Sequence, residues 1–122
     1  MSVEQKESRN IQELLALIRE KPEMYIGASS VIKLSSFLDG YFFAKWQRKD
    51  TDDDFGNMHE FQYMVQERYS IVNSFGWDHI IAFFAGDERK GLDLFWELWD
   101  EHLAAKSANT AGSSRFYGGD FL

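Results

Sequence analysis

Cysteine is absent from this sequence of 122 residues, and proline occurs only once, at Pro22. Without cysteine the chain has no disulfide, no thiolate metal ligand and no cysteine nucleophile. No apolar run approaches the roughly 18 residues that a membrane span needs. The N-terminal segment MSVEQKESRN is polar where a secretory signal would be apolar. We therefore expect a cytoplasmic protein with no membrane-bound form.

Basic residues are also scarce, because 13 Lys and Arg face 20 Asp and Glu, which gives a net charge of −7. Such a chain repels phosphate backbones, so direct binding of nucleic acid is not expected and a basic protein is the better partner. Hydrophobic residues make up 44% of the chain, which is far more than a disordered protein carries. The sequence predicts a folded domain.

Apolar residues with helical spacing predict a first helix over about 9–20, with Ser8 as its N-cap. The connector KPEMYIGASS has turn and cap chemistry, and its residues 24–26 are expected to pack between the first two helices. A long second helix follows Ser30, with Tyr41 and Lys45 on its apolar face. Gly40 inside this helix either kinks it or admits a neighbouring backbone at close range, and we expect the close packing.

Three further helices are predicted after the acidic loop DTDDDFGN at 50–57. The first runs from about Met58 to Tyr69. The segment WDHIIAFFAG predicts a short, strongly buried helix between Ser74 as cap and Gly86 as C-terminal residue, although IIAFF also fits a strand. A final helix, capped by Asp87, is apolar on two sides. Together they predict an all-α, compact bundle of about five helices.

The domain organisation follows from where this periodicity ends. Residues 1–106 are expected to form a single helical domain. Residues 107–122, SANTAGSSRFYGGDFL, are rich in small side chains and predict a flexible C-terminal tail.

The sequence contains no HExxH, GxSxG, Walker A or GxGxxG motif, so we predict no catalytic residue, no cofactor and no metal. The three histidines, His59, His79 and His102, lack the spacing of zinc ligands. The loop that starts at Asp50 resembles a calcium loop only in its acids, because Phe55 and Phe61 stand where glycine and glutamate are required. A small hydrolase would need a polar cleft that holds at least two of the histidines.

Acidic residues gather in one stretch, because Asp50 to Glu67 holds six acids and no Lys or Arg. The final helix, from Asp87 to His102, adds six acids against two basic residues, and the two segments together would form a negative face. Such a face attracts a cationic partner, although acidic helices are often no more than soluble surface. The residues that we expect to bind the partner are Asp50, Asp52, Asp53, Asp54, Phe55, Glu60 and Glu67.

Four segments, ELLALIREKPEMYIG, LSSFLDGYFFA, FQYMVQERY and SFGWDHIIAFFAGDERKGLDLFWELWDEHL, resemble a group of small bacterial immunity proteins of polymorphic toxin and contact-dependent growth inhibition systems. The resemblance covers about residues 11–103. It implies a protein that binds and neutralises a cognate toxin domain stoichiometrically, and such toxins are frequently cationic nucleases. The resemblance supplies no catalytic residues.

The alternative function is a non-catalytic adaptor or regulatory protein that binds an unrelated partner. The position of the gene separates the two, because an immunity gene lies directly downstream of the gene for its toxin. Exposed aromatic residues, Trp46 and Tyr117 among the candidates, would serve as contact points for a partner or support a homo-oligomer.

Overall fold

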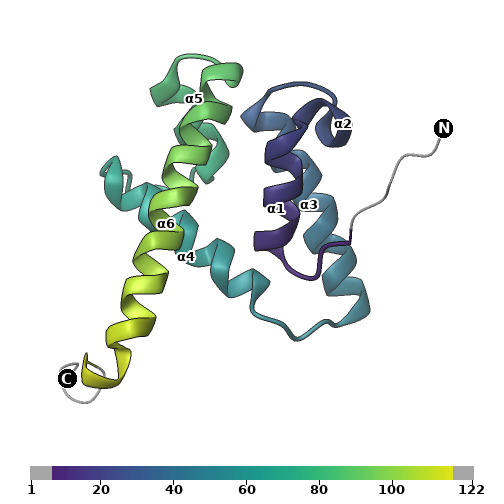
Figure 1. The fold of residues 1–122 in the computed structure, drawn as a ribbon. Helices are drawn as coiled ribbons and strands as arrows, with labels where there is room; N and C mark the ends of the chain where they lie inside the picture. Colours follow the sequence, from purple (N-terminus) through teal and green to yellow (C-terminus); the bar gives the residue numbers. More distant parts are fainter. Residues whose placement is uncertain (1–6, 117–122) are drawn as a thin grey trace.

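The computed structural model describes residues 7–116, with side chains for residues 7–108. Within this range every regular element is a helix, which confirms the predicted all-α bundle, including a helix where IIAFF also fitted a strand. Figure 1 shows these elements. They are α1 (Ile11–Glu20), α2 (Pro22–Ile26), α3 (Val31–Arg48), α4 (Asp54–Arg68), α5 (Trp77–Ala85) and α6 (Glu88–Phe116).

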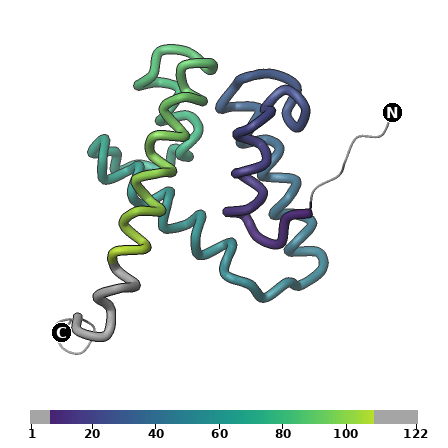
Figure 2. Tube along the Cα trace, in the orientation of Figure 1, coloured from purple at the N-terminus to yellow at the C-terminus, as the bar shows by residue number. Residues whose placement is uncertain are grey.

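The long helix α6 is the axis of the bundle. Helix α5 folds back against α6 and also packs on α3 and α4, while α3 and α4 make contacts of their own with α6. In Figure 2 the first three helices form one side of the molecule, and α4 carries the chain across to α5 and α6 on the other side. Residues near the start of α4 and the end of α3 therefore lie far along the molecule from α5.

The core is centred on the ring of Phe61, which is fully buried. Its ring makes edge contacts with Trp77, Phe95, Trp99 and His102, at centroid separations between 5.3 and 5.8 Å. Edge-to-face packing of this kind adds to the stabilisation from burial itself. The predicted inward residues of α1 and α6 are confirmed in this core: Ile11, Leu14, Leu15, Ile18, Leu92, Phe95, Trp96, Leu98 and Trp99.

Several helix ends differ from the sequence prediction. The N-cap of α1 is Asn10 and not Ser8, and its Oδ1 atom accepts the backbone N–H of Glu13 at 2.9 Å. Ser74 does not cap α5, whose N-cap is Gly76. Both predictions failed because several cap-forming residues precede each helix and only the backbone path selects one of them.

Other helix ends match the prediction. Ser30 caps α3 by accepting the N–H of Lys33, and Gly86 ends α5 in the left-handed conformation with φ 101°. Asp87 accepts the N–H of Lys90 at 2.7 Å in the first turn of α6. Side-chain caps and left-handed glycines therefore set the limits of three helices.

The close approach expected at Gly40 occurs instead at Gly91. Apart from its sequence neighbours and the nearby backbone of α3, no described atom lies within 4 Å of the position that a Cβ would take at Gly40. The expectation of close packing at Gly40 is therefore wrong. A Cβ at Gly91 would lie 2.6 Å from Cγ1 of Val31, and this glycine lets α6 approach α3.

Two expectations about burial are corrected. Helix α5 buries Ile80 and Ile81, but Phe83 and Phe84 are exposed, so the helix is not buried on all sides. In the connector, Tyr25 and Ile26 pack against the core as expected, whereas the side chain of Met24 is exposed.

The helix α6 continues beyond the boundary at residue 106 and ends at Phe116. The part of the predicted tail at 117–122, which includes Tyr117, lies outside the described residues.

Candidate functional site

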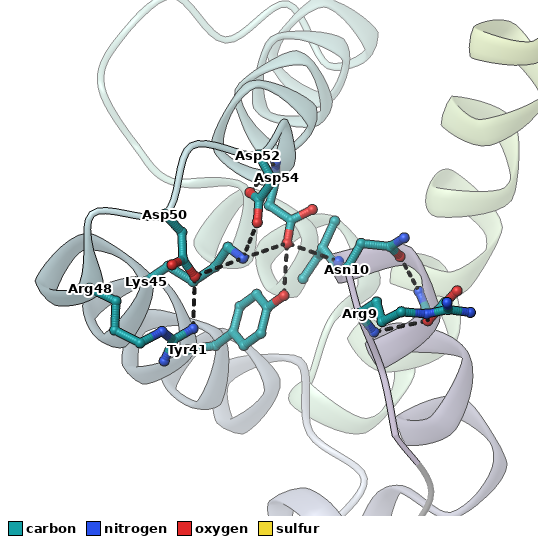
Figure 3. A network of polar contacts seen from close by, with 10 residues as sticks. Arg9, Asn10, Tyr41, Lys45, Arg48, Asp50, Asp52 and Asp54 are labelled. Carbon is teal, nitrogen blue, oxygen red and sulfur yellow. Dashed lines mark hydrogen bonds and ion pairs between the residues drawn. The ribbon is translucent and has the colours of Figure 1, made fainter.

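A network of polar side chains joins the end of α3 to the starts of α4 and α1 (Figure 3). Asp54 is at its centre, with 3% of its surface exposed. Its Oδ2 atom accepts the backbone N–H of Ile11 at 3.0 Å and the hydroxyl of Tyr41 at 2.7 Å. The ammonium group of Lys45 lies 3.4 Å from the same oxygen. One carboxylate therefore holds three helices together.

Lys45 also binds two further acids of the loop, Asp50 and Asp52. Its ammonium group forms an ion pair with Asp52 and lies 3.6 Å from Asp50, which in turn pairs with Arg48 at 2.8 Å. Burial lowers the pKa of Lys45, but the hydrogen bond with Asp52 and the neighbouring acidic groups outweigh it, so the pKa stands above its ordinary value. Lys45 remains a cation inside the protein.

The same contacts shift the other titratable groups of the network. Burial, reinforced by the hydrogen bond to Asp54, raises the pKa of Tyr41 to about 12. The hydrogen bond from Arg48 lowers the pKa of Asp50, and the one from Lys45 lowers the pKa of Asp52. At neutral pH the phenol is a donor and both carboxylates are charged.

The network changes the interpretation of the acidic loop. Asp54 is buried, so the structure removes it from the predicted partner-binding set, and Asp50 and Asp52 are neutralised by Lys45 and Arg48. Charge counted along the sequence missed this because both cations precede the loop, in the last turns of α3. These three acids stabilise the fold and contribute little to the negative face.

The remaining acids form a row on the outer side of α4. Asp53, Glu60 and Glu67 are spaced by seven residues, or two helical turns, so they share one face, and all three are exposed. Tyr63 lies between the last two and is 65% exposed. We call these four residues the α4 stripe.

Two further contacts concern the predicted set. Phe55 is 38% exposed and packs on Phe42 of α3, and its position in the sequence places it on a different side of α4 from the stripe. Glu60 lies 3.4 Å from Lys106 in an exposed ion pair, so part of its charge is balanced within the chain.

An apolar surface continues from the end of the α4 stripe over the segment 70–75 and onto α5. Exposed fractions reach 99% for Val72, 59% for Phe75 and 77% for Phe83. Phe84 is also exposed, with its ring stacked on Tyr69 at 4.4 Å. Contiguous exposed rings of this kind mark interaction sites in globular proteins. We call this region the α5 aromatic face.

Two neighbouring hollows shape this surface. The first, of about 400 Å³, is lined by Ile71, Phe75, His79, Ile80, Phe83 and Phe84. The second, of about 710 Å³, is lined by Tyr63, Gln66, Glu67, Ser70, Ile71 and Val72. Ile71 belongs to both, so the α4 stripe and the α5 aromatic face meet there.

Sequence reasoning missed the α5 aromatic face. It took WDHIIAFFAG as wholly buried, because an apolar run does not reveal which side of a helix faces the core. The available signal was the composition of α5, because seven of the nine residues in WDHIIAFFA are apolar and they are distributed around all sides of a short helix. A helix that packs on its neighbours with one side cannot bury all of them.

The three histidines have different surroundings. His102 is buried, its Nε2 lies 2.6 Å from Oδ1 of Asn57, and burial lowers its pKa. His59 is exposed beside Tyr63, and the exposed His79 contacts Asp78. Within the described part of the chain, no three His, Cys, Asp or Glu side chains are grouped so as to hold a metal ion.

The acids of α6 are partly paired. Asp100 makes two hydrogen bonds with Arg19 across a hollow of about 550 Å³ between α1 and α6, and Glu101 pairs with Arg68. The guanidinium of Arg19 also lies 5.2 Å from the ring centre of Trp96. The negative face expected for this helix is therefore reduced.

None of the helices in residues 7–116 combines the length and the hydropathy of a membrane span. Comparison of the chain with protein-family models, curated proteins and solved structures finds no match in any of the three.

Proposed function

We propose that this protein is an immunity protein, which binds a cognate, cationic toxin domain and neutralises it by stoichiometric association. The observation that carries the proposal is the junction of the α4 stripe with the α5 aromatic face, where exposed acids adjoin exposed rings. Protein interfaces combine aromatic anchors with charged groups around them in this manner. The sequence resemblance supplies the class of partner.

The positions of the exposed acids support a cationic partner, and they indicate which surface it would approach, which the total charge does not. Asp50, Asp52 and Asp54 are paired with cations of α3, whereas the exposed Asp53 and Glu67 lie on one side of α4 together with Glu60, whose ion pair with Lys106 is at the surface. A field from one side orients an approaching basic protein and raises its association rate. The revised binding set is therefore the α4 stripe together with the α5 aromatic face.

The test uses the toxin domain encoded next to this gene. Cells that express that domain are expected to grow when the full chain is co-expressed, and the purified pair is expected to form a one-to-one complex. The variant E60K/E67K should weaken binding by about 100-fold, because two attractive charges become repulsive.

The matched control is D93K/E97K, which makes the same change of charge at exposed positions of α6. It should cost much less affinity. Equal losses in the two variants would reject the α4 stripe, and failure of the wild-type chain to protect cells or to bind the domain would reject the proposed function.

A further inference from the structure

The hollow on the α5 aromatic face is built to take an apolar side chain. Phe75, Phe83 and Phe84 line it around Ile80, which is itself only 3% exposed. His79 is the only residue of its lining with a titratable side chain. Rings that remain exposed beside an apolar hollow lose contact with water when a complementary apolar group enters.

Two backbone carbonyls beside the hollows are already occupied. The carbonyl of Phe75 already accepts the side-chain amide of Gln62, and the carbonyl of Asn73 accepts that of Gln66. The hollow is otherwise bordered by α4 and α5, whose backbone groups bond within each helix. An extended strand needs free partners for its own amides, whereas a helix brings its backbone bonds with it. A helix is therefore the better occupant.

The charges around the hollows determine which residues are favoured next to the apolar side chains of that helix. Among the described residues, the linings of the two hollows contain no Lys or Arg, and Glu67 lines the hollow nearer to α4. A helix that lies across both hollows meets the negative charge of Glu67 at that edge, so basic residues there are favoured and acidic residues are repelled.

We propose that the hollows on either side of Ile71 are the docking site for one amphipathic helix with an apolar face and Lys or Arg along its border. The inference rests on the proposed function for the identity of the partner, because the toxin domain would supply this helix. The proposed contact includes Phe75, Phe83 and Glu67.

The experiment measures binding of two labelled helical peptides, each about five turns long, to the full chain by fluorescence anisotropy. Both peptides carry the same leucine face, one with lysine and the other with glutamate at the remaining positions. We expect the lysine peptide to bind. Phe75→Ser and Phe83→Ser should each weaken it about tenfold or more, and Glu67→Lys should shift the preference toward the glutamate peptide.

The control is Phe43→Ser, which removes a ring of similar exposure, 60%, from α3 and should leave binding unchanged. Phe84 is left intact because its ring stacks on Tyr69. Equal binding of the two peptides to the wild-type chain, or unchanged binding by Phe83→Ser, would overturn the proposal. A dimer seen by sedimentation that Phe83→Ser dissociates would overturn it in favour of a second copy as occupant.

The two proposals fail separately. If Phe83→Ser still protects cells from the toxin domain with full potency and still binds it with unchanged affinity, the helix-docking site is rejected and the immunity function stands. If the lysine peptide binds as described but the chain gives no protection, the docking site stands and the function is rejected.

Discussion

His102 is the residue whose burial has a measurable consequence for stability. Its imidazole contacts the rings of Phe61 and Trp99 and hydrogen-bonds with Asn57, and burial lowers its pKa below the ordinary value of 6.5. Of the charged groups near it, Lys106 lowers the pKa further and Glu60 raises it. The folded state therefore keeps this ring neutral at a pH where an unfolded chain binds a proton.

The sign of the pH effect follows from proton binding. Between about pH 6.5 and the lower pKa of the folded state, the unfolded chain binds more protons, so the free energy of unfolding falls as the pH falls. We expect a loss of up to about 1.4 kcal/mol per pH unit in this window. Urea unfolding at a series of pH values measures it. His102→Gln should flatten the dependence, and equal slopes in the two proteins would contradict this account.

At the scale of single helices, alanine substitutions at two glycines should have opposite effects on stability. Gly40 lies in the middle of α3 with nothing within 4 Å of a Cβ, so Gly40→Ala should stabilise the protein by about 0.5–1 kcal/mol through helix propensity. Gly91→Ala should destabilise it, because the new methyl would lie 2.6 Å from Cγ1 of Val31. Thermal unfolding compares the two. A stabilised Gly91→Ala would show that α3 and α6 do not pack as closely as described.

The helices themselves could be predicted from sequence, because their apolar residues recur with the helical period. Even the inward position of Lys45 followed from its place in line with Leu34, Leu38 and Tyr41. What the period does not give is which of several apolar sides faces a neighbour. For α5 this depends on α6, α3 and α4 together, and Ile80 and Ile81 turn inward while Phe83 turns outward.

The candidate site was predictable only in part, for a related reason. Glu60 and Glu67 are exposed as expected, and the ion pair of Glu60 with Lys106 of α6 is itself at the surface. The burial of Asp54 depends on the backbone of Ile11, 43 positions earlier in the chain, and on Tyr41 and Lys45. Counting charges along the sequence does not reveal that these groups meet in the fold.

At the scale of the whole molecule, charge is distributed unevenly. The net charge of −7 includes acids that are neutralised inside the chain, so the field that a distant partner meets arises from those at the surface. Fields between separate molecules act over about 10 Å at an ionic strength of about 0.1 M and are screened by added salt.

Salt should therefore slow the binding of the toxin domain more than it speeds release. Raising the ionic strength from about 0.02 M to about 0.5 M should lower the association rate constant by about tenfold or more, with a much smaller change in dissociation. Surface plasmon resonance or stopped-flow fluorescence separates the two rates. An association rate that does not depend on salt would show that the α4 stripe does not guide the encounter.

The buried carboxylate of Asp54 makes substitution costly at the residues that contact it, in contrast to residues on the exposed surface. Because one oxygen of Asp54 accepts from the backbone of Ile11 and the hydroxyl of Tyr41 and faces Lys45, replacing the side chain of Asp54, Tyr41 or Lys45 alone leaves a buried polar group without its partner. By contrast, the exposed hydrocarbon side chains of Val72, Phe75 and Phe83 are not hydrogen-bond partners of a buried polar group. These side chains can therefore change without disturbing the buried network, so the proposed binding surface can vary while the scaffold stays the same.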